Sequence, residues 1–364
     1  MKESEFEELL EHEKAADVIQ ELRNEKDIPL ILWGAGEVAV AVKKYLKQNN
    51  IFPVAVWIDG KKEKAVFEEL PVMSLDEIKQ KYKIFNVFLG HSKYDLGEII
   101  LERESQVNRV FYLVSVLYEQ YRTIEYNSIK KYLHKYFAIY QLLQDSKSKK
   151  SLIAYLNSRM TNNIAYIREC VEKEQNYFVN DIFQIGCDED YVDVGAFNGD
   201  SIKLFLDKSQ GKYNSISAIE PDKENYRVLK QYVNQAKVEG INLYNIGTWN
   251  ECKCLSFQEE GEQKSSIQLA EGNSKVQVDT LDNILEGKKV SIIKINFFIG
   301  VLETLEGALN TLILYKPKLA ITVGFDEWAM IEILGFLNRN IPEYKLYLRY
   351  NRCMPACLML YAMC

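Results

Sequence analysis

Residues 188–222 constrain the fold of this chain more than any other stretch, because they join two strands through a glycine turn and a helix. The β-rich run at 191–194 enters a turn that begins at Gly195 and ends at Gly199. An amphipathic helix follows, and the next apolar strand ends at Glu220. This order is typical of the first half of a nucleotide-binding α/β domain.

The turn and the acid favour an adenosyl ligand, S-adenosylmethionine rather than NAD. Gly195 and Gly199 lack Cβ atoms, so the backbone can bend sharply and approach a ligand closely. Amide groups at the helix start can bind a carboxylate, and Glu220 is placed to accept both ribose hydroxyls. The two glycines are spaced differently from those of the G-x-G-x-x-G dinucleotide fingerprint. The alternative is an ordinary turn that uses glycines only for its geometry.

Length and charge limit the class of protein. A chain of 364 residues is long enough for two or three domains. A net charge of −7 argues against nonspecific binding of nucleic acid. The acidic, amphipathic N-terminus has no secretory pattern, and the apolar runs are too short to cross a bilayer. We therefore expect a cytoplasmic protein without a nucleic-acid or membrane partner.

Cysteine and histidine argue against a metal centre. The 7 cysteines are an odd number in a large chain, which indicates reduced thiols. The pairs Cys252-x-Cys254 and Cys353-x-x-x-Cys357 have poor zinc spacing and no histidine nearby. Residues 135–364 contain no histidine, so this part alone cannot form a Ser-His-Asp triad.

Three regions are expected: a small α/β domain with an N-terminal helix at 1–115, a helical connector at 116–180, and a second α/β domain at 181–364. The helix is predicted over 1–27 from its apolar spacing. Aromatic residues at helical spacing mark the connector, and they are more often core than part of a cofactor site. Later in the chain, a β-hairpin excursion is expected over 254–269.

The first domain carries the spacing of a dinucleotide fingerprint. Gly34 and Gly36 follow a strand, and Asp59 comes after the next strand. With the following Pro71-Val72, this pattern resembles the N-terminal domain of bacterial sugar acyltransferases. The resemblance implies a nucleotide-sugar site at Gly34, Gly36 and Asp59; the alternative is a domain used for packing or for a homo-oligomer. An NAD-dependent oxidoreductase is disfavoured, because no catalytic Tyr/Lys or histidine constellation accompanies the fingerprint.

Over residues 175–364 the chain resembles FkbM-type methyltransferases. The matching stretches, in the family's order, are 177–183, 188–202, 218–229, 276–285, 292–308, 316–323 and 344–362. The resemblance implies a class I methyltransferase fold (Rossmann-like α/β), S-adenosylmethionine, and O-methylation of a sugar or related hydroxyl on a small molecule or glycan. The predicted cofactor residues are Asp193, Gly195, Ala196, Gly199, Asp200, Glu220, Pro221, Gly247 and Thr248.

The acceptor side departs from the family pattern K-x-D-x-E-G-x-E. Asn296 stands in place of the aspartate, and Phe298 and Val301 stand in place of the two glutamates. An amide cannot take a proton from a hydroxyl acceptor. The remaining catalytic candidates are Asn296 itself and the acids Asp326 and Glu327, whose alternative role is to start a helix.

Two functions compete. An active methyltransferase with an unusual acceptor pocket is favoured by the intact cofactor stretch. A catalytically degenerate binding or scaffold protein in glycan modification is favoured by the lost acceptor-side acids, since fold does not fix function.

Overall fold

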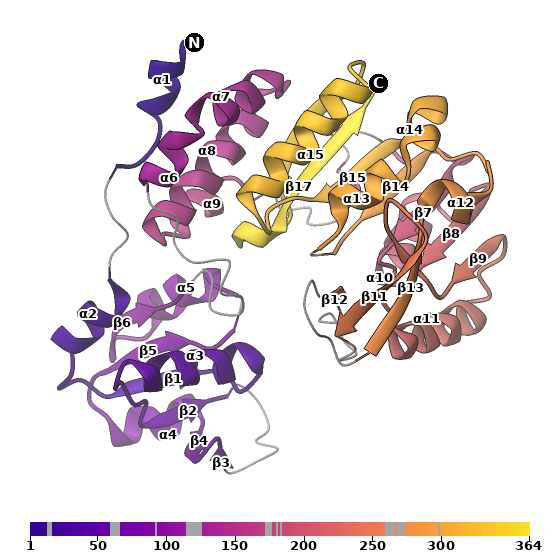
Figure 1. The fold of residues 1–364 in the computed structure, drawn as a ribbon. Helices are drawn as coiled ribbons and strands as arrows, with labels where there is room; N and C mark the ends of the chain where they lie inside the picture. The colour runs from indigo at the N-terminus through magenta and orange to yellow at the C-terminus, as the bar shows by residue number, and fades with distance from the viewer. Residues whose placement is uncertain are drawn as a thin grey trace. The chain divides into compact units, whose positions relative to one another are not determined.

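The computed structural model describes residues 1–12, 17–58, 66–91, 93–113, 126–171, 177–179, 181–182, 184–258, 266–267, 274–297 and 299–364. The chain forms two compact units, whose ribbons are drawn in Figure 1. Unit 1 comprises Met1–His134, Lys150–Val171 and Arg352–Pro355. Unit 2 comprises Lys135–Lys149, Glu172–Asn351 and Ala356–Cys364. The predicted domain boundaries near residues 115 and 180 stay predictions.

Unit 1 is built on a mainly parallel sheet with the strand order β3-β4-β2-β1-β5-β6, in which only β3 and β4 pair antiparallel. Its strands are β1 (Leu30–Trp33), β2 (Ala55–Trp57), β3 (Val66–Phe67), β4 (Leu70–Met73), β5 (Phe85–Leu89) and β6 (Val107–Phe111). Its first helices are α2 (Val18–Asn24), α3 (Glu37–Gln48), α4 (Leu75–Lys81) and α5 (Asp95–Arg103). Every residue of β1 and β5 is buried, so both faces of the central strands are covered.

The N-terminal stretch does not form the single helix predicted over 1–27. Helix α1 (Glu3–Glu7) is short, and α2 begins only after Asp17. The Asp17 carboxylate accepts hydrogen bonds from the N–H groups of Ile19 and Gln20 at 3.0 and 3.1 Å. This capping starts a new helix at Asp17, which the apolar spacing alone did not reveal.

The aromatic region is mostly helical among its described residues, as predicted. Its helices are α6 (Tyr126–Lys131), α7 (Leu133–Leu142), α8 (Ser146–Thr161) and α9 (Ala165–Arg168). Asp145 lies between α7 and α8 and caps the start of α8. Its carboxylate accepts hydrogen bonds from the Ser148 N–H and hydroxyl groups at 2.8 and 2.6 Å. Helix α8 therefore begins at Ser146, directly after this cap.

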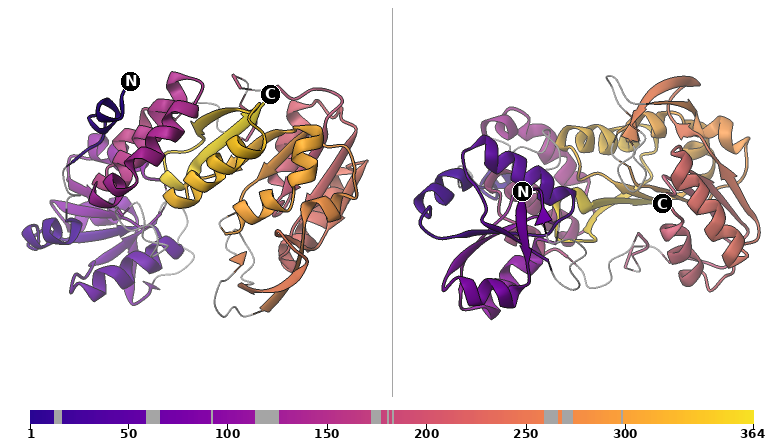
Figure 2. Two further views of the ribbon diagram at one scale, coloured as in Figure 1. Left: turned by 45° about the horizontal axis from the view of Figure 1, so that its top comes forward. Right: turned by 90° about the horizontal axis from the view of Figure 1, so that it is seen from below.

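Unit 2 is built on a sheet with the order β16-β17-β15-β14-β7-β8-β9, parallel except for β17, which is antiparallel to both neighbours. Its strands are β7 (Asp190–Val194), β8 (Ser215–Ile219), β9 (Ile241–Tyr244), β14 (Ile292–Ile295), β15 (Lys318–Thr322), β16 (Lys345–Tyr350) and β17 (Leu358–Met363). The helices are α10 (Asp200–Lys208), α11 (Lys223–Ala236), α12 (Leu281–Leu285), α13 (Val301–Glu306), α14 (Leu309–Tyr315) and α15 (Glu327–Asn340). Helices flank both faces of this sheet (Figure 2), and all residues of β7 and β14 are buried.

The strand order of this sheet reverses between β7 and β14. The chain continues from β7 to β8 and β9 on one side, whereas β14 and β15 lie on the other side. In open α/β sheets, ligands bind outside the carboxyl ends of the strands at such a reversal. Gly195 and Asn296 follow β7 and β14 directly, and the Asn296 N–H donates to the Val194 carbonyl at 3.3 Å. The fold therefore indicates a ligand site at this edge of the sheet.

A second, smaller sheet in unit 2 has the order β10-β13-β11-β12. Its strands are β10 (Gly247–Thr248), β11 (Lys253–Gln258), β12 (Ser266–Ile267) and β13 (Ser274–Asp279). Strands β11 and β12 pair antiparallel, which confirms the predicted hairpin excursion. Trp249 follows β10 and is buried against Gly300 and Gly307, the residues that flank α13.

Replacing Gly307 by alanine should destabilise unit 2. A Cβ atom at this position would overlap the Trp249 carbonyl oxygen, which is backbone and cannot rotate away. We expect a loss of about 2–3 kcal/mol in the free energy of unfolding, measured by urea denaturation. Gly335→Ala in α15 is the control: its Cβ would meet only the flexible end of Arg339, at 3.1 Å, and should be neutral or stabilising. Equal effects of the two changes would contradict this packing account.

Candidate functional site

The turn after β7 uses backbone conformations that favour glycine at both ends. Gly195 has φ +74° and Gly199 has φ +91°. A Cβ atom on Gly195 would lie 2.9 Å from the Asn296 carbonyl oxygen, so the ends of β7 and β14 approach each other closely. The N–H groups of Gly195 and Ala196 donate to the Ile219 carbonyl, each at 3.0 Å. The turn is thus held between the two neighbouring strands.

Helix α10 begins directly after the glycine turn. Gly199 is the N-cap residue and gives no side-chain cap. The Asp200 N–H donates to Asn198 Oδ1 at 3.2 Å, and the Ser201 N–H donates to Asp200 Oδ1 at 2.8 Å. These amides at the helix start already have acceptors within the chain.

Glu220 is a buried carboxylate at the carboxyl end of β8, with 5% of its surface exposed. Its Oε2 atom accepts from the Phe197 N–H at 2.8 Å, and its Oε1 atom accepts from the Asp222 N–H at 2.9 Å. Burial raises the pKa of Glu220 to about 7, although these two hydrogen bonds oppose the shift. Asn245 Nδ2 donates to the carbonyls of Glu220 and Pro221, which fixes this corner.

Lys294 and Asp193 form a buried ion pair beneath the turn. Lys294 Nζ donates to Asp193 Oδ1 at 2.8 Å and to the Gly195 carbonyl at 2.7 Å. Only 1% of Lys294 and none of Asp193 is exposed. Asp193 Oδ2 accepts from the Ser201 hydroxyl at 2.6 Å. Burial alone would lower the pKa of Lys294, but Asp193, together with Tyr177 and Asp200, raises this pKa above its ordinary value.

Asn296 lies beside this pair and connects two other side chains. Its Nδ2 atom donates to the Tyr177 hydroxyl at 2.7 Å, and its Oδ1 atom accepts from the Thr322 hydroxyl at 2.7 Å. Thr322 ends β15 and is buried. Asn296 is the one weak catalytic candidate that lies at the carboxyl edge of β14.

The predicted cofactor residues Ala196, Gly247 and Thr248 are buried. Ala196 is fully buried. A Cβ atom on Gly247 would lie 2.9 Å from Val278 and 3.7 Å from Pro221. The buried Thr248 hydroxyl is hydrogen-bonded to the Thr304 hydroxyl at 2.7 Å. Their contact with a cofactor stays a prediction.

The remaining acceptor-side candidates lie at the start of α15. Asp326 is the N-cap residue, and its Oδ1 atom accepts from the N–H groups of Trp328 and Ala329 at 2.7 and 2.8 Å. This is the helix-starting role that the sequence offered as the alternative. The side chain of Glu327 lies outside the described residues, as does the whole of Phe298.

The glycine pair of unit 1 follows β1. Gly34 has φ +116°, and a Cβ atom there would lie 2.8 Å from the Gly90 carbonyl oxygen. Gly36 is the N-cap residue of α3, and a Cβ atom there would meet nothing within 4 Å. The fold itself therefore gives no steric reason for glycine at position 36. Asp59, the third predicted residue, lies outside the described residues.

Sequence reasoning did not assign a role to Lys294, Tyr177 or Thr322. The available signal was Lys294, a single charge in the otherwise apolar run Ile292–Ile295. A lysine within a fully buried strand requires a partner, and the register pairs it directly with Asp193. Tyr177 and Thr322 are distant in sequence from Asn296 and gave no such signal.

The strand order and the reversal between β7 and β14 define a class I methyltransferase fold. The crystal structure of methyltransferase FkbM from Methylobacillus flagellatus KT matches it with a TM-score of 0.71, at 18% identity over 96% of this chain and 94% of that chain. The two proteins share a fold, which confirms the predicted FkbM-type architecture. Neither a protein-family model nor a curated protein sequence matches this chain.

Two further structures match about half of this chain. An rRNA methylase from Streptococcus thermophilus matches with a TM-score of 0.32 at 14% identity, over 49% of this chain and 88% of that chain. A SAM-dependent methyltransferase from Aquifex aeolicus matches with a TM-score of 0.32 at 14% identity, over 55% and 98%.

Two negative findings apply to the described part of the chain. Within it, no helix has the length and apolar character needed to cross a membrane. In the same residues, no group of three or more histidine, cysteine, aspartate or glutamate side chains is arranged to hold a metal ion.

Replacing Lys294 by methionine should leave Asp193 as an unpaired buried charge. We expect a loss of about 3–5 kcal/mol in the free energy of unfolding, measured by urea denaturation. Lys316→Met is the matched control, because Lys316 pairs with Glu343 at the surface and should change stability by less than about 1 kcal/mol. Similar losses of unfolding free energy in the two variants would contradict a stabilising role for the buried pair.

Glu220 should make stability fall as pH rises from 4.5 to about 7. Its pKa is raised from 4.5 to about 7, so the folded state binds more protons than the unfolded state in this window. The linked loss is about 3 kcal/mol and is complete above the higher value. Urea denaturation across this range should show that Glu220→Gln removes this component. Parallel curves for the two proteins would contradict the raised pKa.

Proposed function

We propose that the chain is an S-adenosylmethionine-dependent methyltransferase that acts on a hydroxyl of a sugar or related small molecule or glycan. The observation that carries the proposal is Glu220, a buried carboxylate held by two backbone N–H groups just past β8. It lies one strand from the reversal at which class I folds bind ligands. The sugar acceptor is supported by the sequence resemblance to FkbM-type methyltransferases.

The residues at the carboxyl edge fit an adenosyl group. Each Glu220 oxygen accepts one backbone N–H and has a further lone pair, which suits a ribose diol. Gly195 and Gly199 bring the turn backbone close to that carboxylate, and Pro221 and Asn245 fix the corner beyond it. When bound, S-adenosylmethionine supplies an electrophilic methyl group on a positively charged sulfur. The protein's part is to align that methyl group and to remove the acceptor's proton.

A second candidate is a binding or scaffold protein that has kept the fold without the reaction. Asn296 favours it, because an amide that bridges Tyr177 and Thr322 replaces the expected acid. The first candidate requires both adenosyl binding and turnover, whereas the second requires no turnover. Release of S-adenosylhomocysteine in the presence of a panel of sugars supports the first.

Calorimetric titration with S-adenosylhomocysteine tests the cofactor site. The wild-type protein should bind this ligand and not NADH. Glu220→Gln should weaken binding by about 1.5–3 kcal/mol, because it removes hydrogen bonds to a charged acceptor. Glu343→Gln, at an exposed surface pair, should leave the affinity unchanged. Undiminished affinity in Glu220→Gln would contradict the ribose role, and absence of wild-type binding would contradict the cofactor.

We also propose a nucleotide-sugar site in unit 1 at Gly34, Gly36 and Asp59, which the open space at Gly36 supports. Titration with UDP-glucose tests it. Gly36→Val should abolish binding by filling that space. Gly36→Ser should retain more binding, because serine is a favourable N-cap residue with a smaller side chain. If wild-type protein and Gly36→Val give the same response, unit 1 serves packing rather than nucleotide binding.

A further inference from the structure

Tyr177 lies at the strand reversal, although it comes from outside the sheet. Its hydroxyl oxygen accepts from Asn296 Nδ2 at 2.7 Å, and Asn296 directly follows β14. The Asn296 backbone in turn donates to Val194 at the end of β7. The phenol oxygen is therefore anchored at the edge where the fold binds its ligand.

The surroundings of Tyr177 combine opposing charges. Lys294 Nζ lies 5.1 Å from the centre of the phenol ring, and Asp193 is paired with that ammonium group. The buried phenol of Tyr191 also interacts with Tyr177. The Lys294 cation and the Asn296 amide favour negative charge on the phenol oxygen, whereas Asp193 opposes it. One further positive charge would shift this balance toward the phenolate.

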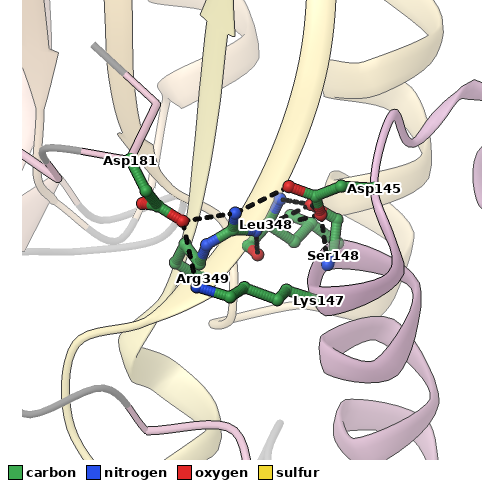
Figure 3. Close-up of polar contacts among 6 residues, drawn as sticks. All are labelled: Asp145, Lys147, Ser148, Asp181, Leu348 and Arg349. Atoms are coloured by element: carbon green, nitrogen blue, oxygen red, sulfur yellow. Dashed lines mark hydrogen bonds and ion pairs between the residues drawn. The ribbon is translucent and has the colours of Figure 1, made fainter.

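Two residues that follow Tyr177 are held in place. Phe178 is buried, with its ring centre 5.7 Å from that of Tyr191 and 6.1 Å from that of Phe205. Asp181 Oδ2 accepts from Arg349 Nη2 at 2.9 Å and from Lys147 Nζ at 3.2 Å (Figure 3). These contacts restrict the positions that the Tyr177 side chain can take.

Arg349 ties this stretch to the same edge of the sheet. It lies in β16, opposite Met359, and Met359 lies opposite Thr322 in β15. Its guanidinium also donates to both oxygens of Asp145, at 3.2 and 2.7 Å (Figure 3). Although burial opposes ionisation, Arg349 and Ser148 lower the pKa of Asp145 to about 2. The clamp is therefore charged at neutral pH, and a rigid support of this kind keeps a reacting group aligned.

We propose that Tyr177 is the catalytic base of the methyl transfer, an inference that rests on the proposed function. The acceptor hydroxyl gives its proton to the Tyr177 phenolate oxygen as the acceptor oxygen bonds to the methyl carbon. The electron pair of the broken carbon–sulfur bond stays on sulfur, which becomes neutral. Tyr177 thereby fills the role of the acids that Asn296 and Phe298 replace.

The test is a carbon-13 NMR titration of the whole chain labelled at the tyrosine ζ-carbons. The signal absent from Tyr177→Phe belongs to Tyr177. Asn296→Asp provides a second assignment, because a carboxylate beside the phenol should move the titration midpoint of that signal to higher pH. The titration is run with S-adenosylhomocysteine and with S-adenosylmethionine, which differ in the charge on sulfur. Tyr213 is the internal control: its hydroxyl donates to the Glu239 carbonyl, and it precedes β8 at the opposite edge of the sheet.

The Tyr177 midpoint should lie at lower pH with S-adenosylmethionine than with S-adenosylhomocysteine, and the Tyr213 midpoint should not change. The same Tyr177 midpoint in both complexes would overturn the base role and leave the cofactor proposal intact. If calorimetry detects binding of neither ligand, the proposed function itself fails, and the inference fails with it.

Discussion

The buried ion pair between Lys294 and Asp193 is the interaction on which the candidate site depends. It joins β14 to β7 across the strand reversal, and Lys294 also donates to the Gly195 carbonyl at the start of the turn. Two fully desolvated charges are costly, so the pair does not by itself explain stability. The pair does fix the positions of the two side chains, because separating them would leave each as an unpaired buried charge. The glycine turn, the Asn296 backbone and the start of α10 are all positioned from this pair.

Charge is distributed unevenly around the edge that this pair supports. On one side, Glu220 is buried with backbone N–H groups as its partners, and its pKa is raised by that burial. On the other side, Asn296, Thr322 and Tyr177 form a row of uncharged polar groups. The first arrangement suits a ribose, and the second leaves a phenol as the candidate to take a proton.

Much of this arrangement could be predicted from the sequence, because it follows from local patterns. The strand, glycine turn, helix and Glu220 are contiguous. The class I fold was implied by the resemblance of residues 175–364 to FkbM-type methyltransferases. The new helix start at Asp17 was missed, because capping by a single side chain outweighed apolar spacing. The contacts of Tyr177 with Asn296 and of Arg349 with Asp145 and Asp181 join residues far apart in sequence. No local pattern encodes such pairs; only the tertiary fold brings them together.

The central claim is that the carboxyl edge at β7, β8 and β14 is an adenosyl-binding edge. Hydrogen–deuterium exchange with and without S-adenosylhomocysteine tests it most directly, because it locates the bound ligand on the chain without requiring an acceptor. The account predicts slower exchange at 195–201, 220–222 and 295–297, with no change in β1, β2 and α3 of unit 1. Unchanged exchange at the first three segments under saturating ligand, or protection confined to unit 1, would contradict it.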